Sequence, residues 1–105
     1  GGIAQGFGQA ILEETVYDNN NGQLLSGSFM DYAIPRAEDL INIDLRWNMV
    51  PCETNILQIK GAGEAGAIGA PPAIINALVN ALNIKHIDMP ATPNRVWNEI
   101  NKISA

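Results

Sequence analysis

The sequence has little cysteine, histidine or positive charge. Its single cysteine, Cys52, has no partner for an internal disulfide bond, which suits a reducing compartment such as the cytoplasm. One cysteine and one histidine, His86, make no cluster with metal-ligand spacing, so we expect no metal ligands from this chain. Six basic residues are scattered over a chain of net charge −5, and no basic patch could neutralise a phosphate backbone. The composition argues against a nucleic-acid partner.

The sequence also lacks a long uninterrupted apolar run. No such run reaches the roughly 20 residues of a membrane span, and no basic segment precedes an apolar one at the start, so we expect no membrane partner. Hydrophobic residues make up 47% of the chain and charged residues 16%, which is typical of a folded, soluble domain. The length of 105 residues predicts a single domain, 1–105, with a modest core.

Three segments carry helix signals. Apolar residues recur at helical spacing over 3–17, although we expect the glycines among the first eight residues to loosen the first turn. Pro71 and Pro72 suit the first turn of a second helix, which continues through a mostly apolar run. Thr92 suits an N-cap with Pro93 at the first helical position, which predicts a terminal amphipathic helix.

Other segments carry strand signals. The segment 41–50, INIDLRWNMV, alternates between apolar and polar residues and predicts a half-buried strand, which Pro51 ends. Segments 23–35 and 84–88 are further strand candidates because they contain strand-prone residues. Together the patterns predict an α+β fold, with about three helices packed on a small sheet.

The stretch KGAGEAGAIGAPP, residues 60–72, is rich in glycine and carries a single acid. A phosphate-binding loop would need a Lys-Ser/Thr pair after the last glycine, and Glu64 would repel an anion. Gly61, Gly63 and Gly66 have the G-x-G-x-x-G spacing of a dinucleotide fingerprint, but we expect the helix to begin several residues too late for it. Both patterns are weak signals.

A third interpretation is that the glycines let the backbone approach another group while Glu64 is held in a dry setting. Small and apolar neighbours would supply that setting. Removing a carboxylate from water makes it a better proton acceptor near neutral pH, which predicts a general base. The alternative is that Glu64 is an exposed charge in a flexible loop. The neighbours concerned are Ala62, Ala65, Ala67 and Ile68.

Several segments, in this order and at these separations, resemble the C-terminal end of the molybdopterin-binding large subunit of the xanthine dehydrogenase, aldehyde oxidase and aerobic carbon monoxide dehydrogenase family. The resemblance covers essentially the whole chain, and it is far more specific than any single glycine pattern. The segments are GGIAQGFGQAILEE, GQLLSGSFMDYAIPRAEDL, ETN, KGAGEAGAIGAPPAIINAL and HIDMPATPNRVW.

The resemblance implies a molybdenum hydroxylase, an oxidoreductase that hydroxylates a carbon of an aldehyde, N-heterocycle or similar small substrate with oxygen from water. The glutamate of the family's GxGE motif matches Glu64, which is thereby implied as the base that takes the proton from Mo–OH while hydride passes to the sulfido ligand. The implied cofactor is molybdopterin cytosine dinucleotide carrying molybdenum. Candidate cofactor contacts implied by position are Lys60, Gly61, Ala62, Gly63 and Gln5.

The family's large subunit is several times longer than this chain. The resemblance therefore implies partners: the remainder of the molybdopterin subunit, and iron–sulfur and FAD subunits or domains. We expect the isolated chain to be inactive and to hold no cofactor stably, and its start without methionine suggests a processed chain, a truncated product or a piece of a split subunit. The alternative is a non-catalytic truncated domain that folds and self-associates, as a homo-oligomer, without cofactor.

The remaining distinctive residues have structural interpretations. His86 is expected to be structural rather than a ligand, and Cys52 a small, partly buried thiol. The resemblance does not match Cys52 to the family's selenium- or sulfur-bearing cysteine, which lies outside this segment. Trp47 and Trp97 fall on apolar stripes and are expected in a core or an interface. The charged residues of 31–39 predict a solvated turn with local ion pairs.

Overall fold

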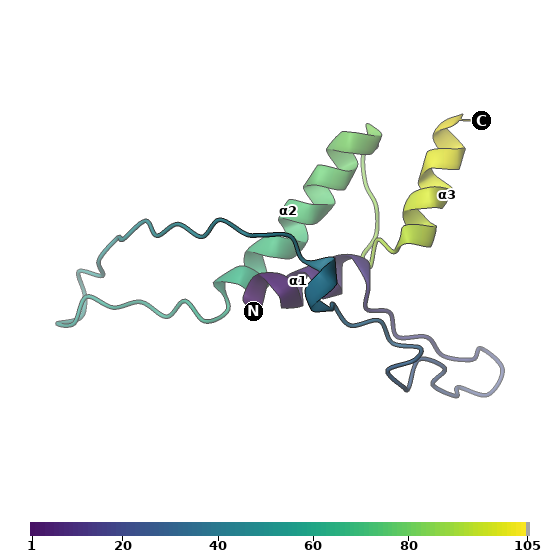
Figure 1. The fold of residues 1–105 in the computed structure, drawn as a ribbon, viewed down its shortest axis with the longest axis horizontal. Helices are drawn as coiled ribbons and strands as arrows, with labels where there is room; N and C mark the ends of the chain where they lie inside the picture. Colours follow the sequence, from purple (N-terminus) through teal and green to yellow (C-terminus); the bar gives the residue numbers. More distant parts are fainter. Residues whose placement is uncertain (105) are drawn as a thin grey trace.

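The computed structural model describes residues 1–104 and contains three α-helices joined by long irregular segments (Figure 1). The helices are α1 (Gly2–Ile11), α2 (Ala65–Leu82) and α3 (Pro93–Ser104), and a 3₁₀ turn, η1, covers Ala37–Asp39. The radius of gyration is 17.8 Å, whereas a compact domain of this length has one of about 13 Å. The chain is therefore extended and buries little of its own surface.

The predicted α+β fold is wrong, because the described residues contain no strand and no sheet. Their only strand-like pairing is an isolated antiparallel bridge between Tyr17 and Leu24. Segment 84–88 is irregular as well. A period-two pattern shows which side chains would face an apolar partner, but a strand forms only where a neighbouring strand accepts its hydrogen bonds. The described part of the chain offers 41–50 no such neighbour.

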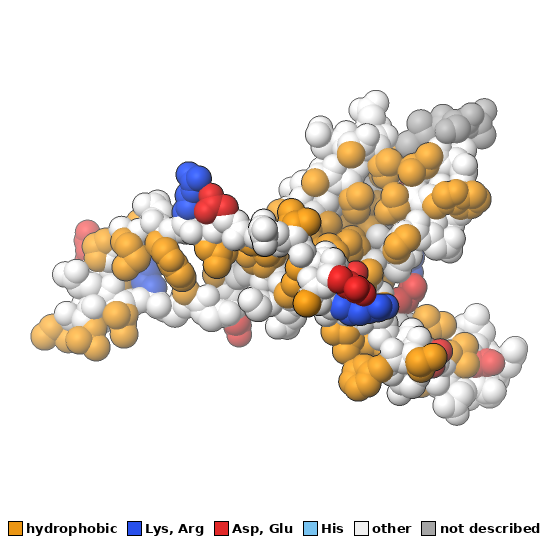
Figure 2. Space-filling model, in the orientation of Figure 1, with side chains coloured by type: hydrophobic (Ala, Val, Ile, Leu, Met, Phe, Trp, Pro, Cys, Tyr) orange, Lys and Arg blue, Asp and Glu red, His pale blue; other side chains and the backbone are white. Residues whose placement is uncertain are grey.

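We call residues 41–63 the arm, because the chain runs outward and returns through them without packing on the helices (Figure 1). Every residue of 41–50 is exposed, and Trp47 is 83% exposed. Figure 2 shows hydrophobic side chains gathered along the arm. Trp97, on α3, is also exposed, at 62%, so neither tryptophan lies in a core of this chain. Their expected role at an interface stays a prediction.

Helix α1 is shorter than the predicted 3–17 and buries a different face. The amide nitrogens of Leu12 and Glu13 both donate to the carbonyl oxygen of Gly8, at 2.9 and 2.8 Å, and this ends the helix at Ile11. The buried residues are Gly6, Gly8 and Ala10 rather than a large apolar stripe. The glycines therefore do not loosen the helix but let other segments approach it closely.

Helix α2 begins six residues before the predicted start. It follows Glu64 directly, so Pro71 and Pro72 lie inside the helix, where the lack of two N–H groups removes two of its i→i−4 hydrogen bonds. It ends at Asn83, which adopts a left-handed conformation with φ 53° and ψ 41°. The glycine residues of its first turns are unfavourable in a helix by propensity, although the alanines between them favour it, and the helix packs closely against α1 at Gly66.

Helix α2 is also long and apolar enough to cross a membrane by length and composition alone. It has 18 residues with a mean hydropathy of 1.4, and 11% of them are buried. The sequence expectation considered only uninterrupted apolar runs and missed this helix. One such helix is weak evidence for a membrane span, because core helices of soluble proteins have the same length and composition.

The prediction for the terminal helix is confirmed. Helix α3 starts at Pro93, and the Thr92 hydroxyl oxygen accepts a hydrogen bond from the amide of Arg95 at 3.4 Å. The carbonyl oxygen of Thr92 accepts the amide of Val96 at 2.9 Å. The first bond satisfies a donor that a helix start otherwise leaves free, and the second is the first intrahelical bond of α3.

The small core lies where α1 meets the segment that leads into α3. Ala10 is fully buried, Ala91 is 1% exposed and Ile87 is 6% exposed. The amide of Ala91 donates to the carbonyl oxygen of Ala10 at 2.7 Å, which ties the C-terminal part of the chain to the end of α1. Helix α2 packs on α1 as well, so α1 holds the described structure together.

Candidate functional site

The helices α1 and α2 cross with their backbones in close approach. A Cβ atom added to Gly66 would lie 2.7 Å from the amide nitrogen of Ile3, and one added to Gly6 would lie 2.8 Å from the Cβ of Ala70. Carbon atoms in contact prefer separations of about 3.5 to 4 Å, so no larger side chain fits at either glycine without movement. The two helices can therefore meet at this distance only because both positions are glycine.

The other glycines of the stretch have open space around them. A Cβ atom added to Gly61, Gly63 or Gly69 would meet nothing within 4 Å. The backbone of 61–63 is exposed, so its amide and carbonyl groups are accessible from outside the chain. The glycine-rich stretch thus contains one residue used for helix packing, Gly66, and two that leave the main chain before α2 open.

Glu64 lies at the boundary between this open segment and α2. Its backbone has φ −98° and ψ −4°, and its carbonyl oxygen accepts the amide of Ile68 at 3.0 Å as the first bond of the helix. Its side chain makes no capping hydrogen bond and is exposed. It lines an open hollow of about 550 Å³ together with Gly61, Ala62, Gly63, Ala65 and Ile68.

This placement agrees in part with each sequence interpretation of Glu64. The neighbouring side chains are small and apolar as expected, but the described residues do not enclose the carboxylate in a dry setting. The side chain is exposed, as the alternative interpretation expected, and its backbone directly precedes the first residue of α2. The role of Glu64 therefore stays a prediction.

The start of α2 also bears on the dinucleotide fingerprint. The helix begins immediately after Glu64, so Gly66 falls in its first turn, and the objection that the helix begins too late is wrong. The fingerprint additionally requires a strand before its first glycine. Residues 51–60 contain no strand, so the described structure lacks the βαβ setting of a dinucleotide site.

The other candidate contacts, Lys60 and Gln5, lie on two different elements. Lys60 is exposed on the returning half of the arm, where it borders an apolar groove of about 570 Å³ that Trp47 and Met49 also line. Gln5 is exposed on α1, about one turn from Gly2. Because Gly2 packs against Gly66, the crossing brings the start of α1 to the start of α2. Figure 1 shows the N-terminus beside the beginning of α2.

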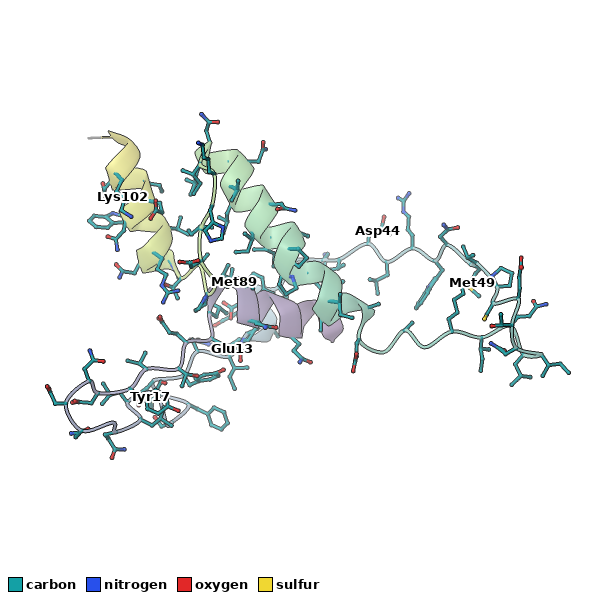
Figure 3. All side chains as sticks on the ribbon, turned by 180° about the vertical axis from the view of Figure 1, so that it is seen from behind. Glu13, Tyr17, Asp44, Met49, Met89 and Lys102 are labelled. Carbon is teal, nitrogen blue, oxygen red and sulfur yellow. The ribbon has the colours of Figure 1, made fainter. Side chains whose placement is uncertain are left out.

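Two acidic residues that follow α1, Glu13 and Glu14, hold segments together. The Tyr32 hydroxyl donates to Glu13 Oε2 at 2.7 Å, and this bond raises the pKa of Tyr32. Glu14 pairs with Arg95, which also donates to the carbonyl oxygen of Pro90 at 3.0 Å. Figure 3 shows Glu13 where the segment after α1 leaves the helices. The sequence carries no local signal for these contacts, because Glu14 and Arg95 are far apart in the chain.

The structure also places His86, Cys52 and the charged segment 31–39, for which the sequence predicted structural roles. His86 Nε2 lies 2.8 Å from Asp88 Oδ1, and both side chains are exposed. Cys52 is a free, half-buried thiol whose contact with the Thr54 hydroxyl, 3.1 Å from Sγ, lowers its pKa. Local ion pairs are confirmed in 31–39, where Arg36 pairs with Glu38 at 3.0 Å. Within residues 1–104, no group of three or more His, Cys, Asp or Glu side chains could hold a metal ion.

The described chain thus combines a glycine-packed crossing of two helices, an exposed carboxylate at a helix start and a long arm that does not pack on the helices. A family model described as the molybdopterin cofactor-binding domain matches residues 1–41. The chain is 36% identical over 99 residues to the nicotine 6-hydroxylase large subunit of Paenarthrobacter nicotinovorans, covering 91% of this chain and 12% of that protein. It is 33% identical over 100 residues to the carbon monoxide dehydrogenase large chain of Afipia carboxidovorans, covering 92% and 12%.

The solved structures agree with these relatives. The crystal structure of quinoline 2-oxidoreductase from Pseudomonas putida 86 matches with a TM-score of 0.85 and 38% identity, covering 96% of this chain and 13% of that one. The chain belongs to the molybdopterin-binding large subunits of the molybdenum hydroxylase family, which includes xanthine dehydrogenase. It spans only 12 to 13% of the length of the relatives described above. The resemblance inferred from the sequence motifs is confirmed.

Proposed function

We propose that this chain supplies the catalytic base, Glu64, and main-chain cofactor contacts to a molybdenum hydroxylase that needs further polypeptide to turn over. The observation that carries the proposal is the position of Glu64. Its carboxylate is exposed at the start of α2, beside an accessible glycine backbone, in a chain that matches molybdenum hydroxylase large subunits. A base must be positioned by the fold and still reach its substrate, and the backbone of a helix start with an exposed side chain suits both needs.

The residues before α2 fit part of a molybdopterin group. The backbone of Gly61 and Gly63 is exposed and has open space around it, so a flat ring system could approach its N–H and C=O groups. The exposed ammonium of Lys60 suits an anionic phosphate. The described residues enclose nothing at this place and contain no metal-ligand cluster, so they support contact with the group without holding it alone.

Each residue then has a role within the complete site. Main-chain groups of 61–63 bind and orient the pterin, and the Gln5 side chain approaches it from α1. Glu64 accepts a proton from the water-derived group that attacks the substrate carbon. When bound, the molybdenum group supplies Lewis acidity and takes up the two electrons of the oxidation. The balance is R–H + H₂O giving R–OH, two protons and two electrons.

Further parts of the proposal follow from the relatives. Seven-eighths or so of the large subunit lies outside the matched segment, and we propose that it encloses the cofactor and selects the substrate, an aldehyde, N-heterocycle or similar small molecule. The electrons leave through iron–sulfur and FAD partners. We propose the cytosine dinucleotide form of the cofactor and a cytoplasmic location, the latter because the lone thiol of Cys52 suits a reducing compartment.

The test is Glu64→Gln in the complete large subunit assembled with its partners. Glutamine keeps the size of the side chain but cannot accept a proton, so we expect kcat to fall by about 100-fold or more while molybdenum content stays the same. Glu38→Gln is the matched control, because Glu38 is exposed in η1 and pairs only with the exposed Arg36. Unchanged hydroxylation by Glu64→Gln would rule out the catalytic assignment.

One observation favours the alternative of a self-associating domain without cofactor. Large hydrophobic side chains are widely exposed, including Phe29 at 88% and Ile56 at 97%, and such surface promotes association. Molybdenum analysis of the purified chain together with its solution mass separates the two functions. A metal-free, dilution-stable oligomer that does not dissociate on mixing with the remainder of the subunit would favour the alternative.

A further inference from the structure

The first contact of the α1–α2 crossing lies two residues from Glu64. A Cβ atom on Gly66 would lie 2.7 Å from the amide nitrogen of Ile3 and 2.8 Å from the carbonyl carbon of Gly2. In the reverse direction, a Cβ atom on Gly2 would lie 3.2 Å from the amide nitrogen of Ala67. The obstructing atoms are all backbone atoms, which cannot rotate away as a flexible side chain can. The crossing therefore sets the separation of the two helix starts.

The same turn of helix contains the backbone of Glu64. Its carbonyl oxygen accepts the amide of Ile68 at 3.0 Å, so Glu64 and Gly66 move together as parts of one hydrogen-bonded turn. On the other side of Glu64, Gly61 and Gly63 are exposed and have open space around them. The packing that places Glu64 relative to α1 is thus found at Gly66 and not in the segment before it.

We propose that Gly66, packed on Gly2, is a positioning residue that sets where the Glu64 carboxylate stands relative to the start of α1 and to Gln5. This inference rests on the proposed role of Glu64 as the base. A methyl group at Gly66 forces the first turn of α2 away from α1 by roughly 0.8 to 1.3 Å, because its carbon atom would lie 2.7 Å from the backbone of α1 whereas carbon contacts need about 3.5 to 4 Å. A displacement of this size at a reacting group is enough to slow catalysis by about 100-fold.

The experiment uses the complete, cofactor-loaded enzyme with Gly66→Ala. The matched control is Gly69→Ala, which makes the same chemical change in the same helix at a position with open space. We expect Gly66→Ala to lower kcat by about 100-fold with a much smaller change in KM and unchanged molybdenum content, and Gly69→Ala to change none of these. Independently of activity, hydrogen exchange at the Ile68 amide is expected to quicken in Gly66→Ala alone.

A double variant separates positioning from general damage. If Gly66 acts through Glu64, adding Gly66→Ala to Glu64→Gln slows the enzyme no further, because the carboxylate it displaces is already gone. If the two losses multiply, Gly66 acts independently and the inference is overturned. Full activity of Glu64→Gln would instead refute the proposed role of Glu64 as the base. A slow Glu64→Gln with a fully active Gly66→Ala would leave the proposed function standing and refute only the positioning role.

A second pair of variants covers the case in which Gly66→Ala does not fold. A Cβ atom on Gly6 would lie 2.8 Å from both the Ala70 Cβ and the Pro71 Cδ, one turn further along the crossing. Gly6→Ala is expected to slow the enzyme, and adding Ala70→Gly removes one of the two obstructing atoms and is expected to restore part of kcat. No restoration by Ala70→Gly, with molybdenum content equal in both variants, would overturn the role of the crossing.

Discussion

Replacing Gly66 by alanine in the chain itself measures how much stability depends on the close crossing of α1 and α2. The new Cβ atom would lie 2.7 Å from the backbone of Ile3, so either the helices separate or the first turn of α2 unwinds. Forcing an extra methyl group into a packed contact costs about 1 to 3 kcal/mol. We expect the obstruction to lower the free energy of unfolding by about that amount, partly offset by the higher helix propensity of alanine.

Comparison with Gly69→Ala isolates the cost of obstructing the crossing of α1 and α2. Gly69 has open space around its Cβ position, and alanine is a better helix former than glycine by about 0.8 to 1 kcal/mol in a helix interior. Helix propensity is therefore raised in both variants, and only Gly66→Ala also obstructs the crossing. The two variants are expected to differ in free energy of unfolding by about 1 to 3 kcal/mol, the cost of the obstructed crossing alone.

The assay is urea unfolding monitored by far-UV circular dichroism, which measures the helical content of the chain. The midpoints of Gly66→Ala and Gly69→Ala are expected to lie on opposite sides of the parent midpoint, with similar slopes. Equal midpoints for the two variants would show that the helices do not meet at the distance described, and the reasoning on the crossing would be refuted.

Three further outcomes follow from contacts outside the crossing. Thr92→Ala removes the N-cap of α3 and is expected to lower the free energy of unfolding by about 1 kcal/mol, measured by urea unfolding, with Thr92→Ser close to the parent chain. Arg95→Ala removes the pair with Glu14, which is only partly buried, so a loss of about 1 kcal/mol or less is expected, and a larger loss would mean that the pair is more buried than described. The bond to Glu13 raises the pKa of Tyr32 above that of the unfolded chain, so its contribution is present below about pH 10 and is lost as the pH rises through the folded value. Thermal unfolding midpoints above that pH should therefore fall more in the parent chain than in Tyr32→Phe, and parallel curves would contradict the contact.

Local sequence signals predicted the helices better than the rest of the fold. The N-cap at Thr92 and the start of α3 were correct, because a cap depends on atoms within one turn. The start of α2 was misplaced by six residues, because two prolines usually mark a first turn, whereas here Gly66 packs on α1 and lies in the helix ahead of them. The end of α1 was misplaced because the apolar spacing continues past Ile11, although the helix ends where Leu12 and Glu13 both donate to the Gly8 carbonyl oxygen.

The strand prediction failed for a related reason. The alternation in 41–50 is real, but strand formation needs a partner, and the described chain leaves these residues exposed. The chain matches a 12% portion of its relatives, so much of the surface that its apolar residues would face lies outside it. The candidate contacts at Lys60, Gly61, Ala62, Gly63 and Gln5, and the catalytic role of Glu64, stay predictions.

By itself the sequence determined the family, through motifs in a fixed order, and it determined the local capping of α3. It also marked Glu64 as the only carboxylate within the glycine stretch. Only the tertiary structure decided that Gly66 packs on Gly2, that α2 begins directly after Glu64 and that the carboxylate is exposed. The physical reason is that caps and motifs are set by neighbours in the chain, whereas close backbone packing depends on which glycines of two distant helices meet.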